Sequence, residues 1–182
     1  TIAEQFVPGV GAAWKMDLTP AYMNGQHVIR TVVHFYPGFV AVLDEATTPK
    51  KQEISLRWHT RDRAAPDSEG RFTVRGEKGN ASALITRLDE GELAFSRNEH
   101  EHRVGFDTDR GGAPLTPRRE SYVEAKFRGN SCRILTLFNV QAVDTADSIW
   151  TKSEGGWSNG DVELRLTEGG LEMSRTDQAI SI

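Results

Sequence analysis

Residues 28–45 have the sequence VIRTVVHFYPGFVAVLDE. Both halves of this stretch are rich in β-branched and aromatic residues, and Pro37 and Gly38 separate them, which is typical of two antiparallel strands joined by a tight turn. Proline presets φ at the first turn position, and glycine is predicted to supply a positive φ at the second. Residues 40–43 are apolar on both faces, so we expect the second strand to be central and covered on both sides.

Alternation of apolar and polar residues continues along most of the chain. In residues 161–166, Val162, Leu164 and Leu166 are predicted to point to one side and the charged residues to the other, which is the period of a half-buried strand. Residues 53–59 repeat the pattern. Further strands are expected at residues 2–6, 12–18, 71–75, 82–88, 93–97, 103–106, 122–127 and 133–138.

Turn-forming residues recur about every 8–12 residues, and no segment has a sustained helical period. Residues 141–150 are predicted to form a short turn at most, and residues 107–119 the longest irregular loop. The sequence therefore predicts an all-β fold, a large two-sheet antiparallel β-sandwich of about 12–14 strands. We expect residues 1–182 to form a single domain, a fragment of a larger protein.

The composition excludes several classes of protein. The chain has 182 residues, of which 37% are hydrophobic and 26% charged, and its net charge is −4. No apolar run is long enough for a transmembrane helix, and no signal peptide is visible, so no membrane partner is expected. The single cysteine, Cys132, excludes an internal disulfide and a cysteine-cage zinc site.

Arginine is concentrated in the middle of the chain. Residues 50–133 carry 17 basic and 14 acidic groups, a net charge of +3. Guanidinium groups suit the recognition of carboxylates and sulfates, whereas a solvated surface of mixed charge is the alternative interpretation. No helix or stripe concentrates the basic groups, so nucleic acid is not an expected partner.

A resemblance to a known family rests on the order of short motifs. Residues 14–22 have the sequence WKMDLTPAY, and Arg30, the apolar hairpin and residues 54–60 with the sequence ISLRWHT follow. This order resembles the C-terminal β-sandwich region of heparinase II/III-like polysaccharide lyases, alginate-lyase relatives included. The resemblance covers about residues 10–140, because residues 72–74, 84–85 and 133–138 also fall in the expected order.

The resemblance implies a larger parent protein, in which an α/α-toroid domain precedes the β-sandwich. It also implies β-elimination on an acidic polysaccharide, in which a base removes a proton next to a carboxylate whose charge must be neutralised. The family places much of its catalytic set in the toroid, so no catalytic residue is assigned here and the chain alone is expected to be inactive. By resemblance the parent is periplasmic or extracellular. A non-catalytic carbohydrate-binding or structural β-sandwich module is the alternative function.

Four residues are candidates for contact with an acidic glycan. Tyr22, Arg57 and His59 lie on polar faces of their predicted segments. Trp157 lies between glycine-rich turns, so it is expected to be the most exposed of the four tryptophans and is the candidate for a flat face toward a sugar ring. Packing in the core or at an interface is the favoured alternative for its ring. Trp58, by contrast, is predicted to lie in the core. No nucleotide-binding motif or nucleophile elbow accompanies these residues.

The strongest metal-binding pattern is His100-Glu101-His102, because the two histidines share one face of a strand. Asp107 and Asp109 are close enough in sequence to supply a third ligand, although their loop lacks the later glutamate of a calcium loop. No cofactor is certain; zinc or calcium is the ion that these residues would bind. Two imidazoles lining a half-exposed strand are the alternative interpretation.

The zinc ligands of the family precede the segment that this chain resembles. His27, His34 and His59 near Asp44 resemble such a histidine and aspartate set only loosely. Asp44 and Glu45, at the end of the apolar strand, are expected to anchor a loop by hydrogen bonds to backbone amides. Arg30 next to such a carboxylate is expected to form a structural ion pair first and a ligand contact second.

Overall fold

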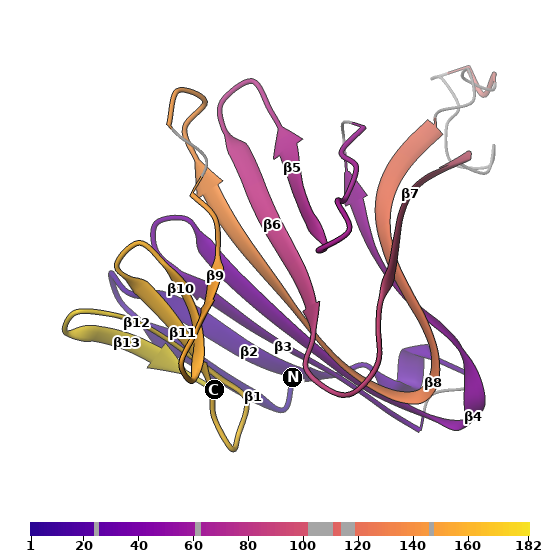
Figure 1. Ribbon diagram of the computed structural model, residues 1–182, viewed down its shortest axis with the longest axis horizontal. Helices are drawn as coiled ribbons and strands as arrows, with labels where there is room; N and C mark the ends of the chain where they lie inside the picture. The colour runs from indigo at the N-terminus through magenta and orange to yellow at the C-terminus, as the bar shows by residue number, and fades with distance from the viewer. Residues whose placement is uncertain (24–25, 61–62, 102–110, 114–118, 146–147) are drawn as a thin grey trace.

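The computed structural model describes residues 1–23, 26–60, 63–101, 111–113, 119–145 and 148–182. These residues form two antiparallel sheets, as predicted (Figure 1). The large sheet has the order β1-β2-β3-β4-β8-β6-β5, with β7 also paired to β8. Its strands are β1 (Ala3–Val7), β2 (Gly11–Asp17), β3 (His27–Phe35), β4 (Phe39–Thr60), β5 (Arg71–Arg75), β6 (Asn80–Arg87), β7 (Ala94–Glu101) and β8 (Arg119–Gln141).

The small sheet contains the C-terminal strands in the order β13-β12-β11-β10-β9. Its strands are β9 (Thr151–Ser153), β10 (Gly156–Asn159), β11 (Val162–Leu166), β12 (Leu171–Arg175) and β13 (Gln178–Ser181). A 3-10 turn, η1 (Thr19–Ala21), lies between β2 and β3. In the part of the chain that the structure describes, no helix has the length and apolarity needed to cross a membrane.

The hairpin of β3 and β4 lies at the centre of the large sheet, as its sequence predicts. Ala41, Val42 and Leu43 are all buried, because β4 has β3 on one side and β8 on the other and both faces are covered. The predicted positive φ at Gly38 is wrong, since its backbone does not adopt the left-handed conformation. Gly38 is required for space instead: a Cβ there would lie 2.4 Å from the carbonyl oxygen of Val140.

In two places, a pair of strands that were predicted separately forms one long continuous strand. Residues 39–45 and 53–59 belong to β4, and residues 122–127 and 133–138 belong to β8. The two long strands pair along their length, with a register shift between Thr47 and Gln52 where residues 48–51 of β4 lie opposite Asn130 of β8. Extra residues on one strand bend a sheet and increase its twist, so the shift separates the large sheet into two parts.

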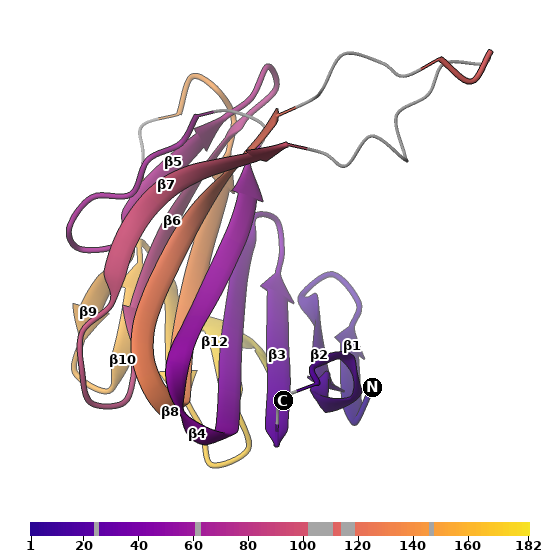
Figure 2. The same cartoon turned by 90° about the vertical axis from the view of Figure 1, so that its right-hand side faces the viewer.

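Beyond this shift the strands form a projection that we call the arm, made of residues 52–60 of β4, residues 119–129 of β8, and β7. Figures 1 and 2 show the arm rising opposite β5 and β6, away from the small sheet. The two parts of the large sheet enclose a hydrophobic cluster that includes Phe72, Ile85, Val123, Phe127 and Ile134.

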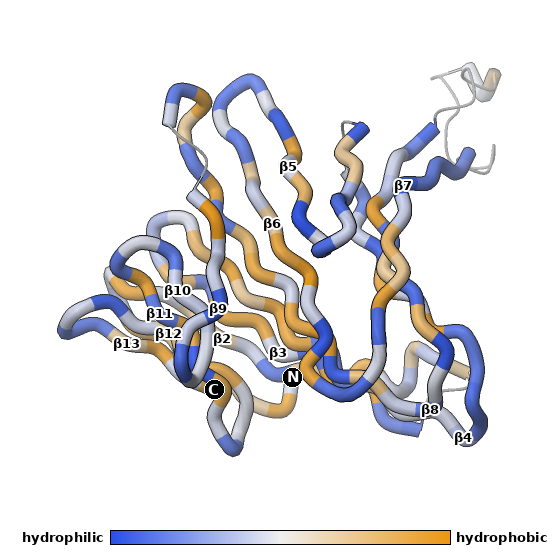
Figure 3. Tube along the Cα trace, in the orientation of Figure 1, coloured by the Kyte–Doolittle hydropathy of each residue, from blue (hydrophilic) through white to orange (hydrophobic). Residues whose placement is uncertain are grey.

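The second hydrophobic cluster lies between the two sheets. Phe35 and Leu137 of the large sheet pack with Trp150, Leu164 and Met173 of the C-terminal region, and each of these side chains is buried. Apolar segments follow the strands in this part of the molecule, whereas hydrophilic residues gather at the turn between β5 and β6 and at the bend of β4 (Figure 3). The packing of the small sheet on β2 and β3 therefore depends on apolar burial.

In β11 the alternating pattern predicts the burial of two of its three apolar side chains correctly. Val162 and Leu164 are fully buried, but Leu166 has 37% of its surface exposed because β11 ends there, at the rim of the sandwich. The expected turn in residues 141–150 is present, with a hydrogen bond from the amide of Thr145 to the carbonyl of Ala142. The predicted strand at 103–106 and most of the predicted loop at 107–119 lie outside the described residues.

Leu164 and Leu166 supply a matched test of the sandwich. We expect Leu164→Ala to lower the free energy of unfolding by about 2–5 kcal/mol, because it leaves a cavity between the sheets. Leu166→Ala should cost less than about 1 kcal/mol, since its side chain already contacts solvent. Urea unfolding followed by tryptophan fluorescence measures both; equal losses would contradict this arrangement of the sheets.

Candidate functional site

Polar side chains from three strands meet on the outer face of the arm. The strand register places His59 of β4 opposite Tyr122 of β8, and His100 of β7 opposite Glu120 of β8. Directly opposed residues of antiparallel strands share a face, so these four side chains point the same way. The structure therefore brings together His59 and His100, which are 41 positions apart in the sequence and were predicted to serve separate functions.

The geometry of this group is compact. His59 Nδ1 lies 3.5 Å from Glu120 Oε2, and His100 Nε2 lies 4.0 Å from the same oxygen. The two imidazole rings meet edge to face with their centroids 5.1 Å apart. Tyr122 lies beside both rings, at 5.5 Å from His59 and 5.8 Å from His100. Solvent reaches the group, because about half of the His59 side chain is exposed.

Arg57 continues the polar face toward the bend, where it contacts a buried carboxylate. Its Nε donates to Glu124 Oε1 at 2.7 Å, and its guanidinium carbon lies 5.0 Å from the Tyr122 ring centroid. The Glu124 side chain is only 2% exposed, and it also accepts a hydrogen bond from Asn98 Nδ2 at 2.9 Å. The hydrogen bond to Glu124 raises the pKa of Arg57 above its ordinary value. The main role of Arg57 is therefore structural, as the charged partner of Glu124, although half of its side chain stays exposed.

Tyr22 lies elsewhere, in a groove at the bend of β4. The groove has a volume of about 430 Å³ and is lined by the residues after η1, by β3 and by both sides of the β4 bend. Arg30 there donates two hydrogen bonds to Asp44, at 2.7 Å and 3.1 Å, which confirms the predicted ion pair. The expected place of Asp44 at the end of a strand is wrong, because β4 continues past it to Thr60. Burial raises the pKa of Asp44 above its ordinary value, and the hydrogen bonds from Arg30 only partly oppose this effect. Arg30 is held by Asp44, whereas Tyr22 is exposed and lines the groove together with the exposed Met23.

The expectation that Trp157 is exposed is wrong. Trp157 is 6% exposed and belongs to the cluster between the sheets, because β10 turns this side chain inward. Trp14 of β2 is the exposed tryptophan, at 37%, and it shares a surface hollow with the exposed Phe6. Trp58, predicted as core, is half-buried and donates from Nε1 to Thr136 Oγ1 at 3.2 Å.

The metal ligands expected from the sequence are only partly described. His100 lies on β7, whereas His102, Asp107 and Asp109 lie outside the described residues. The loose histidine and aspartate set does not assemble: His27 and His34 stand at opposite ends of β3, opposite Thr47 and Val40, and Asp44 is held by Arg30. Instead, the ligand atoms of His59, His100 and Glu120 all lie within 4.8 Å of one another.

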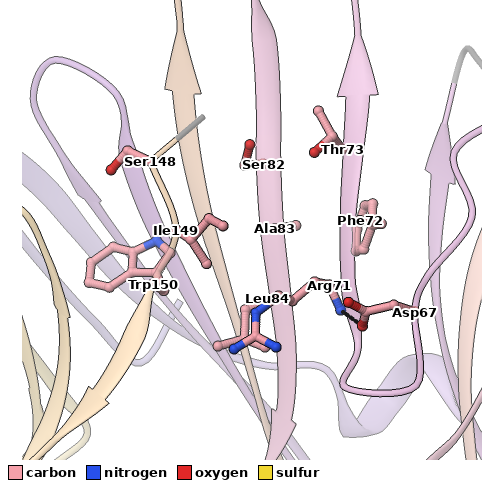
Figure 4. A pocket seen from close by; sticks show the side chains of 10 residues that line it. All are labelled: Asp67, Arg71, Phe72, Thr73, Ser82, Ala83, Leu84, Ser148, Ile149 and Trp150. Atoms are coloured by element: carbon pink, nitrogen blue, oxygen red, sulfur yellow. Dashed lines mark hydrogen bonds between the residues drawn. The ribbon is translucent and has the colours of Figure 1, made fainter. Parts of the chain in front are cut away.

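A smaller hollow of about 270 Å³ lies between β5, β6 and residues 148–150 (Figure 4). Asp67 at its edge accepts hydrogen bonds from the backbone amides of Glu69 and Arg71, at 2.9 Å and 2.8 Å. This carboxylate therefore stabilises the turn before β5. The apolar side chains of Phe72 and Trp150 fill much of the remaining wall, so the hollow is mainly a feature of packing.

Comparison with known proteins shows which solved structures have a similar fold. No family model and no curated protein matches the chain. Among solved structures it is similar to the heparan sulfate lyase HepC from Pedobacter heparinus, with 12% identity and a TM-score of 0.59 over 96% of this chain and 26% of that one. The heparinase III BT4657 gene product gives 13% identity and the same TM-score and coverage. A further heparinase III structure gives 14% identity and a TM-score of 0.53 over 99% of this chain.

This chain has the β-sandwich fold found in those heparinase structures. The resemblance expected from the motifs of residues 10–140 is thus confirmed at the level of the fold. The chain spans about a quarter of the length of the solved structures that it matches.

Cys132 lines the groove but is itself buried, so its reactivity measures how well the groove shields it from solvent. Burial raises the pKa of this thiol to about 11. Because the thiolate is the reactive species, we expect the folded protein at about pH 8 to react with a thiol reagent about 100-fold or more slowly than an ordinary cysteine. The rate should rise to that of a free thiol in urea, and rapid labelling of the folded chain would contradict the burial.

Arg57 and Arg165 form a matched pair for testing the buried carboxylate. Arg57→Ala should lower the free energy of unfolding by about 1–2 kcal/mol, because Glu124 loses its main charged partner while it stays buried. Arg165 contacts the exposed Glu163 at 2.7 Å, so Arg165→Ala should cost less than about 0.5 kcal/mol. Adding Glu124→Gln to Arg57→Ala should restore part of the loss. Urea unfolding measures all three variants, and equal effects of the two arginine substitutions would refute this role.

Proposed function

We propose that this chain is the β-sandwich region of a heparinase-like polysaccharide lyase, which acts on an acidic polysaccharide. The observation that carries the proposal is the likeness of nearly the whole chain to one part of the solved heparinase structures, at a TM-score of 0.59. Function depends on sites rather than on folds. The arm supports the proposal because it presents guanidinium, imidazole and phenol groups on one accessible face.

In this function the sandwich acts as scaffold and as one wall of the substrate cleft. An α/α-toroid preceding it in the same polypeptide supplies the opposite wall and most catalytic groups. Abstraction of the proton next to a uronate carboxylate requires a base, an acid and positive charge fixed around one sugar ring. The half-exposed side chains of the arm lie on an open strand surface, so they hold such a ring from one side only.

The acidic polysaccharide is recognised through its carboxylates and sulfates, because guanidinium groups donate paired hydrogen bonds to both. Arg57, His59 and Tyr22 remain the proposed contacts, with Arg57 and His59 on the arm and Tyr22 in the groove. Heparan sulfate, heparin and alginate are the substrates to compare. For a lyase of such polymers we propose a location in the periplasm or outside the cell.

A second candidate function is glycan binding without cleavage. Exposed Phe6 lies on the edge strand β1 and exposed Trp14 on its neighbour β2, and both line one hollow. Aromatic faces of this kind suit sugar rings. The two functions differ in whether the chain binds glycan on its own and in whether any product forms.

Lyase activity is the direct test. The chain alone should release no unsaturated uronate, seen as ultraviolet absorbance of the conjugated product, from heparan sulfate, heparin or alginate. A longer protein that includes the preceding toroid should release it from at least one of these polymers. Product from the chain alone would refute its role as a cleft wall. Glycan binding without product from either protein would support the second function.

A further inference from the structure

We propose that His59, His100 and Glu120 bind a divalent transition-metal ion of the zinc class on the outer face of the arm. The three ligand atoms come from three adjacent strands, β4, β7 and β8, and lie within 4.8 Å of one another. Two imidazole nitrogens and one carboxylate oxygen are a donor set that zinc uses in proteins, with a fourth position left for water. This proposal does not rest on the proposed lyase function, although it shares His59 with the proposed glycan contacts.

The distances between the donors fit a cation with little rearrangement. Tetrahedral coordination with bonds of about 2.0–2.1 Å puts neighbouring ligand atoms about 3.4 Å apart. His59 Nδ1 and His100 Nε2 already lie 3.5 Å and 4.0 Å from Glu120 Oε2. Both separations exceed the about 2.7–3.2 Å of a direct hydrogen bond. A small rotation of each side chain therefore brings all three atoms around one ion.

The backbone holds the three residues in this arrangement before any ion binds. His100 lies directly opposite Glu120 in the ladder of β7 and β8, and His59 is diagonal to Glu120 across the ladder of β4 and β8. On the inner face of the same strands, Trp58 and Val123 belong to the cluster between the arm and β5 and β6. Because that packing fixes the strands, binding an ion orders side chains only, which lowers the entropic cost.

Access and local charge also favour a cation. The side chains of His59 and His100 are 51% and 42% exposed, so an ion can enter from solvent. Glu120 supplies one negative charge at the centre, whereas Arg57 and Arg119 contact other carboxylates, Glu124 and Glu101, at 2.7 Å and 3.0 Å. Within the described residues, Arg57 and Arg119 are thus each neutralised by a carboxylate other than Glu120.

The set differs from the pattern that the sequence suggests. Sequence spacing pairs His100 with His102, which lies outside the described residues, whereas the ladder brings His59 and Glu120 to His100. His102→Gln therefore distinguishes the two ligand sets in solution. His34, on β3 and beside Tyr36 with ring centroids 4.8 Å apart, supplies a control histidine away from the arm.

The test is titration of the tag-free chain with cobalt(II) and with zinc. Cobalt should give the visible absorption of a four-coordinate site at one equivalent, and zinc should displace it. His59→Gln, His100→Gln and Glu120→Gln should each weaken binding at least about 10-fold. His34→Gln and His102→Gln should bind as the parent does. Circular dichroism of each variant verifies that it is folded.

Thermal unfolding supplies a second readout. Zinc should raise the Tm of the parent chain and of His34→Gln, because an ion that binds only the folded state stabilises it. It should not raise the Tm of folded Glu120→Gln. The proposal is refuted if the parent binds no cobalt at micromolar concentrations. It is also refuted if His102→Gln abolishes binding while Glu120→Gln does not.

Discussion

The pairing of β4 with β8 is the constraint on which the rest of the structure depends. These strands are 22 and 23 residues long, and their ladder runs from Phe39 and Asn139 at one end to Thr60 and Ser121 at the other. One half of the ladder carries the β-sandwich, and the other half is the spine of the arm. The register shift between them bends the sheet, so that the inner face of the arm packs against β5 and β6.

The two halves of this ladder bury apolar side chains against different parts of the molecule, and they therefore have different roles. The sandwich half buries Leu43, Leu135 and Leu137 against the small sheet. The arm half buries Val123 and Ala125 toward β5 and β6, so its other face is left for polar groups. A rigid strand pair with a packed inner face and a polar outer face is a suitable support for a binding site.

Charge is arranged on the arm in pairs, not as one basic surface. The buried Glu124 binds Arg57, and Arg119 pairs with Glu101. Such pairs explain how an arginine-rich segment of a chain with a net charge of −4 avoids self-repulsion. They also mean that an acidic ligand must compete for these guanidinium groups with carboxylates that the protein already supplies.

Alternating apolar and polar residues were enough to predict the all-β class, the central hairpin and the polar face on which Arg57 and His59 lie, because side chains of a strand alternate with period two whatever its neighbours. The burial of Trp157 and Glu124, the exposure of Leu166 and the meeting of His59 with Glu120 required the tertiary structure. Each depends on strand register and on which sheet covers which face. Register is set by pairing between residues far apart in the chain, and no local pattern encodes that distance.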